Sequence, residues 1–270
     1  MSFLNFDDIN YFSLAGFTLN PEERAALSSS LILLRQHERL LSTFLWGKIL
    51  GIQKDYFVAQ GITDDLFARK YFYSMDMVNW LQLPHLTPPE FKHMESILSR
   101  FLGDPSFEYP VTEQVPEGQD APPPINEEKR LAGLVALINH EAQVVPRGAY
   151  YRDAVHELKS NPSFQGLPGP DASHLTSYLH FRPNFKLDLK TVKQLGANYD
   201  ESIDILDSIA MDQPNGVWSL QQENGGEVVL IRSLLWPGYT FFHTPASGIP
   251  VYKDSASPVC VICSSLICSR

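Results

Sequence analysis

Cysteine is almost absent from this chain of 270 residues. Its three cysteines, Cys260, Cys263 and Cys268, all fall within the last eleven positions, so the rest of the sequence has no thiol. A globular part without thiols needs no disulfide framework, which indicates a reducing compartment. For the tail itself the spacing leaves three hypotheses open: a bound metal, a redox role for the Cys-x-x-Cys pair, or reversible acylation.

Long hydrophobic runs and clusters of basic residues are also missing. No apolar run approaches the length of a membrane span, and the first residues carry Asp7 and Asp8 rather than the basic residues that a secretory signal needs. The net charge is −10. Residues 194–231 contain seven acids and no Lys or Arg, and residues 104–130 contain seven acids against two bases. Such a surface argues against a nucleic-acid groove and against docking on anionic membranes, because both need clustered Lys and Arg.

Sequence motifs of catalysis are absent as well. The chain has no Gly-x-Ser-x-Gly elbow, no phosphate-binding loop ending in Gly-Lys-Ser/Thr and no Gly-x-Gly-x-x-Gly motif. His-Glu pairs at 37–38, 140–141 and 156–157 begin like a zinc-protease helix, but the residues four positions after each His are Leu41, Val144 and Ser160. The acids of 200–207 lack the spacing and the glycine of a calcium loop, so they are interpreted as a solvated helix face. We therefore expect no enzyme activity, no metal and no cofactor.

What the sequence does contain is a series of well-signalled helices and aromatic strands. Apolar residues make up 44% and aromatic residues 11% of the chain, enough for a large core. The capping-box pattern of Asn20, Pro21 and Glu23 predicts a helix over 21–40, and further helices are predicted after Thr87 and Asn126. Shorter helical segments are expected over 171–179 and 204–210, and strands over 44–52, 56–59, 70–75 and 144–151.

The stretch 217–243 has the pattern of an antiparallel meander. Residues 217–223 alternate in polarity, Asn-Gly-Gly at 224–226 suits a hairpin turn, and 228–235 is predicted as a central strand. Trp236, Pro237 and Gly238 must then end that strand, because proline has no N–H to donate. Two hypotheses remain open for this corner: a packed core, or an aromatic pocket that serves small-molecule binding or an enzymatic function.

The order of these elements predicts an α+β fold with a mostly antiparallel sheet and peripheral helices, because the regular β-α-β alternation of a parallel sheet is missing. We expect residues 1–245 to form a single domain. Within it, six prolines and seven acids make 104–130 an exposed acidic Pro-rich loop. Residues 246–270 are expected to form a separate Ser/Cys-rich tail.

Several segments together resemble the radial spoke head protein 9 family. In order along the chain they are FLWGKILGIQKDYFVAQGI (44–62), RFLGDPSFEY (100–109), VVPRGAYY (144–151), YLHFRP (178–183), and VWSLQ with VVLIRSLLWPGYTFFH (217–243). Their occurrence in one order is more specific than any single segment. The residues that carry this resemblance, each expected in the core or at an interface, are Trp46, Gly47, Gly51, Arg147, Gly148, Trp218, Arg232, Trp236, Pro237 and Gly238.

The resemblance implies a non-catalytic structural subunit of the radial spoke head in the axoneme of motile cilia or flagella, a cytoplasmic and cytoskeletal location. The implied partners are other radial spoke head subunits, including radial spoke head proteins 4 and 6. The implied role is to help relay control from the central-pair apparatus to the dynein arms. We expect Trp46, Trp218 and Trp236 to lie mainly in the core, and exposed sheet edges to bind a neighbour by strand addition or aromatic anchoring. Residues 246–270 depart from the family pattern, so contacts made through the family's terminal strand are expected to differ.

Overall fold

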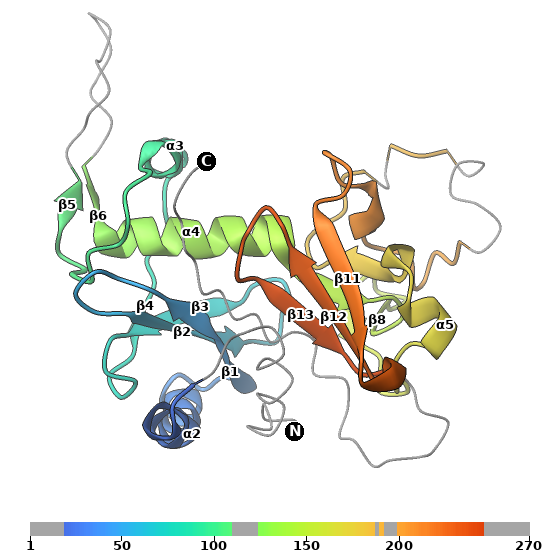
Figure 1. The fold of residues 1–270 in the computed structure, drawn as a ribbon, viewed down its shortest axis with the longest axis horizontal. Coiled ribbons are helices and arrows are strands. Elements are labelled where there is room, and N and C mark those ends of the chain that lie inside the picture. Colours follow the sequence, from blue (N-terminus) through green and yellow to red (C-terminus); the bar gives the residue numbers. More distant parts are fainter. Residues whose placement is uncertain (1–18, 110–123, 187–188, 192–198, 246–270) are drawn as a thin grey trace, which may run out of the picture.

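The computed structural model describes residues 19–109, 124–186, 189–191 and 199–245. Within these ranges the chain is a mixed α+β structure with antiparallel sheets and helices on their faces, as predicted (Figure 1). None of its described helices is long and apolar enough to cross a membrane. The predicted tail, 246–270, lies outside the described residues.

The first sheet has four antiparallel strands in the order β1 (Ser42–Ile49), β2 (Tyr56–Ile62), β3 (Lys70–Ser74) and β4 (Leu81–Gln82). Helix α2 (Pro21–His37) packs on one face of this sheet, through the leucines of its inner side. Helix α4 (Glu127–Ala142) packs on the other face (Figure 1). The sheet is therefore enclosed between two helices.

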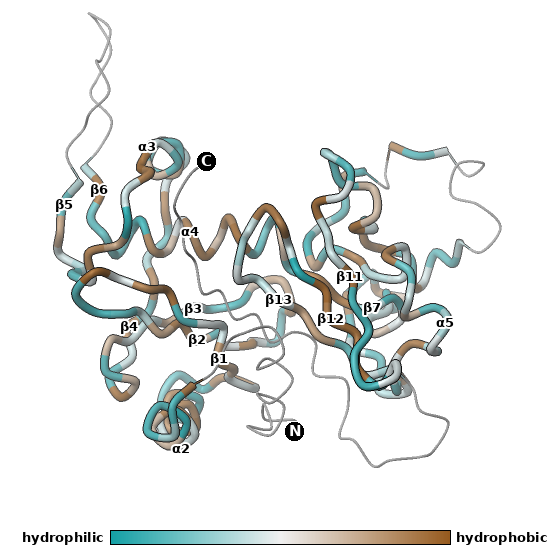
Figure 2. The backbone as a smooth tube through the Cα atoms, in the orientation of Figure 1, coloured by the Kyte–Doolittle hydropathy of each residue, from teal (hydrophilic) through white to brown (hydrophobic). Residues whose placement is uncertain are grey.

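The second large sheet is the C-terminal meander, with strands β11 (Trp218–Glu223), β12 (Val228–Ser233) and β13 (Thr240–His243). Its central strand β12 is apolar along most of its length (Figure 2). The side chains of β12 and β13 enter the same core as those of β1, β2 and β3, and α4 contributes the side chains between them. This shared core makes α4 the element that connects the two sheets.

Shorter elements complete the structure. They are helices α3 (Pro88–Ser96) and α5 (Gly169–Ala172) and three two-stranded sheets. In these sheets β5 pairs with β6, β7 with β10, and β8 with β9. The bounds of these strands are Glu108–Tyr109 (β5), Ile125–Asn126 (β6), Val144–Pro146 (β7), Tyr150–Arg152 (β8), Leu158–Ser160 (β9) and Tyr178–His180 (β10). Single turns of 3-10 helix lie at Leu175–Ser177, Ile209–Met211 and Asn224–Gly226.

The helix starts follow the sequence closely. The N–H of Asn20 donates to Glu23 Oε2 at 2.9 Å, as the capping box predicted. The helix predicted after Thr87 begins in the same way, since the N–H of Thr87 donates to Glu90 Oε2 at 2.8 Å. The end of α2 comes earlier than expected, at His37 rather than residue 40. Arg39 takes a left-handed backbone conformation, φ 52°, which stops the helix.

Three expected elements are wrong in type or extent. Residues 178–180 form β10 instead of continuing a helix, because they pair with β7. The helical turn expected over 204–210 is reduced to Ile209–Met211, because Asp204 and Asp207 accept hydrogen bonds from other segments. The central strand of the meander ends at Ser233, before the Trp-Pro-Gly turn.

The segment 104–130 also differs at its margins from the exposed loop that was expected. β5 and β6 pair with each other, and α4 already begins at Glu127, whose side chain is fully buried. The middle of the segment, 110–123, lies outside the described residues.

Candidate interaction site

Two of the signature tryptophans bind the last two turns of α4. Trp46 lies in β1 and is almost fully buried, and its indole N–H donates to Asn139 Oδ1 at 2.7 Å. Trp236 is half-buried, and its N–H donates to Glu141 Oε2 at 2.7 Å. An indole N–H placed in a core needs such an acceptor. Each of the two large sheets is thus connected to α4 by a hydrogen bond from an indole N–H to a side-chain oxygen of the helix.

The glycines beside Trp46 fit the close packing that the sequence indicated. The pairing of β1 with β2 shifts register between Leu45 and Gly47, which marks a bulge at this point. A Cβ on Gly51 would lie 1.9 Å from the backbone oxygen of Lys54, so no larger residue fits there. Gly47 therefore lies at the bulge in β1, while Gly51, just beyond the end of β1, permits a close approach of the backbone at Lys54.

The Trp-Pro-Gly corner is a tight turn. The N–H of Tyr239 donates to Trp236 O at 2.9 Å, and Gly238 has φ 97°, a conformation that favours glycine. Pro237 lies between them on the surface. Because the Trp236 ring packs on the core and its N–H is bound by Glu141, the corner offers little support for the alternative of an aromatic ligand pocket.

The third tryptophan, Trp218, belongs to a buried polar cluster. Its N–H and His180 Nε2 both contact Asp212 Oδ2 at 2.8 Å, and Lys186 Nζ donates to Asp212 Oδ1 at 2.9 Å. Burial alone would raise the pKa of Asp212, but the hydrogen bonds from His180, Trp218 and Lys186 outweigh it and hold that pKa well below its usual range. Asp212 therefore stays ionised and ties β11 to β10.

Arg147 and Gly148 form the kink between β7 and β8. The guanidinium of Arg147 binds both carboxylate oxygens of Asp204, with Nη2 to Oδ2 at 2.6 Å. Gly148 has φ 86°, and its carbonyl accepts a hydrogen bond from Asn161. The acids predicted to form a solvated helix face thus include Asp204 in an ion pair, and Asp207, which is fully buried and accepts from the backbone N–H of Phe185 at 3.0 Å.

Arg232 lies in β12, one position along the β11–β12 pair from the partner of Trp218. It sits opposite Ser219 in the β11–β12 pair, and its Nη1 donates to Gln221 Oε1 at 3.1 Å. After it, Leu234 and Leu235 are exposed, at 60% and 40%. Leu234 and Leu235 thus form a small apolar surface directly before the Trp-Pro-Gly corner, which we call the apolar tip.

Glu127 is the main polar group that the motifs did not reveal. Its buried carboxylate accepts hydrogen bonds from Tyr56 and Tyr109 at 2.7 and 2.6 Å, and from three backbone N–H groups, those of residues 102, 103 and 104. Burial raises the pKa of Glu127, but these donors outweigh it and lower the pKa overall. Gly103, where a Cβ would meet Lys54 O at 2.4 Å, is the one sequence signal that could have indicated such close packing.

Arg130 extends this cluster along α4. It is buried, donates to Tyr109 Oη at 2.7 Å, and stacks 4.3 Å from the centre of the Phe101 ring. Every polar contact in the cluster joins the start of α4 to β2, β5 or the segment before β5. The arrangement fixes the helix and leaves no open carboxylate, and the described residues hold no group of three or more potential metal ligands.

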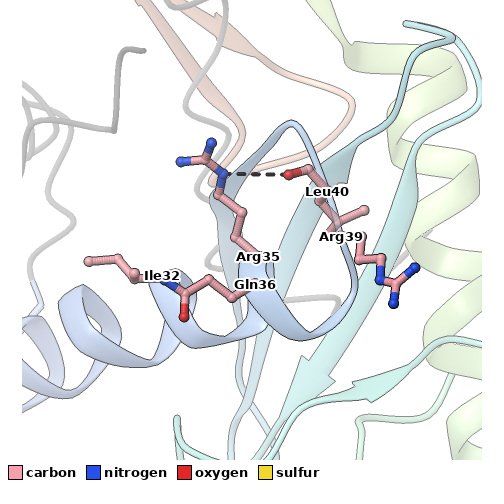
Figure 3. Close-up of a pocket in the computed structure, with 5 residues that line it drawn as sticks. All are labelled: Ile32, Arg35, Gln36, Arg39 and Leu40. Carbon is pink, nitrogen blue, oxygen red and sulfur yellow. Dashed lines mark hydrogen bonds between the residues drawn. The ribbon is translucent and has the colours of Figure 1, made fainter.

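An open pocket of about 430 Å³ lies at the end of α2, lined by Ile32, Arg35, Gln36, Arg39 and Leu40 (Figure 3). Arg35 Nε donates to Leu40 O at 3.4 Å, which holds the guanidinium beside the pocket. The guanidinium groups of Arg35 and Arg39 extend to opposite sides of this turn, so each could bind a carboxylate separately (Figure 3). The signature residues do not contribute to this pocket.

Comparison with known proteins shows the family of the chain. The family model "Radial spokehead-like protein" matches residues 5–66. The chain is 41% identical over 243 residues to a radial spoke head protein 9 homolog of Danio rerio, covering 85% of this chain and 86% of the relative. The chain belongs to the radial spoke head protein 9 family. The Homo sapiens homolog is 39% identical over 239 residues, with 86% of each chain covered, and the Xenopus tropicalis homolog is 40% identical over 244 residues, with 87% and 88% covered.

In this chain, the three tryptophans predicted as signature residues each donate a hydrogen bond that joins two separate elements. Trp46 and Trp236 bind α4, Trp218 binds the Asp212 cluster, and the glycines permit the bulge and turns between these anchors. Within the described residues, Trp46 and Trp236 connect two sheets to helix α4. Exposed groups such as Leu234 remain as candidates for contact with other proteins.

Proposed function

We propose that this chain is a non-catalytic structural subunit of the radial spoke head in the axoneme of cilia or flagella. The observation that carries the proposal is about 40% identity to radial spoke head protein 9 homologs over most of both chains. The geometry agrees with a scaffold, since the buried carboxylates Glu127 and Asp212 are saturated by hydrogen bonds from the protein itself. Catalysis needs polar groups that are free to act on a substrate.

Its partners in this proposal are other radial spoke head subunits, among them radial spoke head proteins 4 and 6, and its functional contact is the central-pair apparatus. A subunit at this position would help transmit signals from the central pair to the dynein arms. The exposed Leu234 and Leu235, next to the half-buried Trp236, supply an apolar anchor of the kind that interfaces enclose. We propose this tip as a contact with a neighbouring subunit.

The proposal is tested by complementation in Danio rerio cells that lack their own radial spoke head protein 9 homolog. A tagged copy of the chain is expected to fractionate with axonemes and to co-purify with radial spoke head subunits after salt extraction. Recovery of the chain only as a cytosolic protein, without those subunits, would contradict the proposal.

The apolar tip is tested in the same cells with the double variant Leu234→Glu, Leu235→Glu. Both side chains are exposed, so folding is expected to persist while recovery in the spoke-head fraction falls at least about tenfold, the effect of a lost anchor of ~1.4 kcal/mol or more. Val155→Glu, at a side chain 72% exposed, is the matched control. Equal recovery of the double variant and the control would exclude the tip as an interface.

A further inference from the structure

The outer face of α2 is uncharged over ten residues of an otherwise charged chain. Residues 25–34, Ala-Ala-Leu-Ser-Ser-Ser-Leu-Ile-Leu-Leu, contain no acid or base. Ile32 and Leu33 are 43% and 64% exposed. The hydroxyls of Ser28 and Ser29 donate back to carbonyl oxygens of Ala25 and Ala26, so they do not make this face strongly polar. An apolar helix face of this kind is a surface for another helix.

The two halves of this face differ in the size of their side chains. Because of this difference, the face is complementary in shape to a second copy of itself that runs antiparallel. The first half carries the small residues Ala25, Ala26 and Ser29, and the second half carries the large residues Ile32 and Leu33. Large side chains on one helix pack into the spaces above small ones on another. A second α2 running antiparallel would place each large pair against a small pair.

The charges at the two ends have the same complementarity. Glu22 is exposed in the first turn, and Arg39 is exposed just beyond the last turn. Among the described residues, neither side chain has an ion-pair partner. The pocket formed by Ile32, Arg35, Gln36, Arg39 and Leu40 opens at this basic end (Figure 3). An antiparallel partner would bring its Glu22 to that pocket.

We propose that α2 is a homodimer interface, in which two copies of this chain pair their α2 helices antiparallel about a two-fold axis near Ser29. Leu33 then packs against Ala25 of the second copy, and Glu22 of each copy enters the pocket beside Arg39 of the other. A two-fold contact requires a surface that matches itself, and the size and charge pattern of α2 meets that condition. One helix pair buries little area, so the contact is weak and depends on concentration.

The net charge of −10 opposes the pairing of two copies, but only over a limited range. The Debye length is about 8 Å at physiological ionic strength, so distant acids on the two copies are largely screened. The charges that come within contact distance, Glu22 and Arg39, have opposite signs. The local attraction therefore decides the geometry of the contact.

Analytical ultracentrifugation of the full chain tests the interface over a range of protein concentrations, with a reducing agent to prevent disulfides between the tail cysteines. The wild type is expected to show a monomer–dimer equilibrium. Leu33→Glu and Ala25→Arg are each expected to weaken the dimer at least tenfold, while Val155→Glu leaves it unchanged. Circular dichroism of each variant checks that it is folded. A wild type that stays monomeric, or a dimer that both α2 variants leave intact, would overturn the proposal.

A charge exchange tests the antiparallel arrangement itself. Glu22→Arg and Arg39→Glu are each expected to weaken self-association, because each places like charges together across the two-fold axis. A mixture of the two variants is expected to form heterodimers preferentially, since both contacts in the mixed pair again join opposite charges. Native mass spectrometry distinguishes the species by mass. A statistical mixture, or no heterodimer, would show that Glu22 and Arg39 do not meet.

Discussion

Helices α2 and α4 are nearly equal in length, 17 and 16 residues, and pack on opposite faces of the same sheet, yet they are held in different ways. α2 has one covered side of leucines and one side open to solvent. α4 lies between two sheets, and its first turns bury Glu127 and Arg130. A helix enclosed on several sides must find partners for its polar groups inside the protein, whereas a helix covered on one side keeps a surface free for another molecule.

The largest expected effect comes from removing the buried acid of α4. Glu127→Ala leaves two tyrosine hydroxyls and three backbone N–H groups without their acceptor, so we expect a loss of about 3–5 kcal/mol in the free energy of unfolding. Glu22→Ala, at the matching first turn of α2, is expected to change it by less than about 0.5 kcal/mol. Urea denaturation at low protein concentration measures both.

Equal stability of the two alanine variants would contradict the claimed difference between the polar groups of α4 and those of α2. Glu127→Gln gives a second check, because an amide oxygen can accept some of the same hydrogen bonds while the charge is lost. We expect its stability to fall between those of the wild type and Glu127→Ala. A Gln variant as stable as the wild type would show that the charge of Glu127 contributes nothing.

The next largest expected effect is a pH dependence of stability, which should arise from the buried His243 and not from the exposed His37 of α2. His243 in β13 is 8% exposed, and its Nε2 accepts the N–H of Leu167 at 2.9 Å. Burial lowers the pKa of His243 to about 4. Because an unfolded histidine titrates near 6.5, the unfolded chain binds more protons between pH 4 and 6.5, and acidification across that window destabilises the fold by at most about 3 kcal/mol.

His243→Gln is expected to remove this contribution, so its unfolding free energy should change less between pH 6.5 and 4 than that of the wild type. The amide oxygen of Gln can still accept the N–H of Leu167. His37→Gln on α2 is the control, since the His37 side chain is 84% exposed. Parallel stability–pH curves for His243→Gln and the wild type would contradict the assignment of a neutral, buried His243.

The difference between the two helices also explains how much could be predicted from the sequence. Helix starts depend on residues three apart, so the capping box at Asn20 and the helix after Asn126 are visible as local patterns. The tight Trp-Pro-Gly turn is local for the same reason. The α+β class follows from the order of such elements.

The contacts that define the candidate site are not local. Trp46 and Asn139 lie 93 positions apart, Trp236 and Glu141 lie 95 apart, and Tyr56 and Glu127 lie 71 apart. No spacing rule pairs them, so an acid such as Glu127 resembles an ordinary residue of a helix's first turn until the fold encloses it. The expected helix over 204–210 failed for this reason, since its acids are bound by distant groups.

The smallest effect distinguishes the two tryptophan anchors of α4. Trp46→Phe removes the donor to Asn139 in a site that is almost fully buried, and we expect it to cost about 2 kcal/mol or more. Trp236→Phe removes the donor to Glu141, which is half-exposed and can bind water instead, so we expect less than about 1 kcal/mol. Thermal unfolding followed by tryptophan fluorescence compares the two variants, and an equal loss would mean that both anchors lie in the same environment. A small stability loss for Trp236→Phe combined with reduced recovery in spoke heads would identify the Trp-Pro-Gly corner as a contact surface, whereas unchanged recovery would assign it to the fold alone.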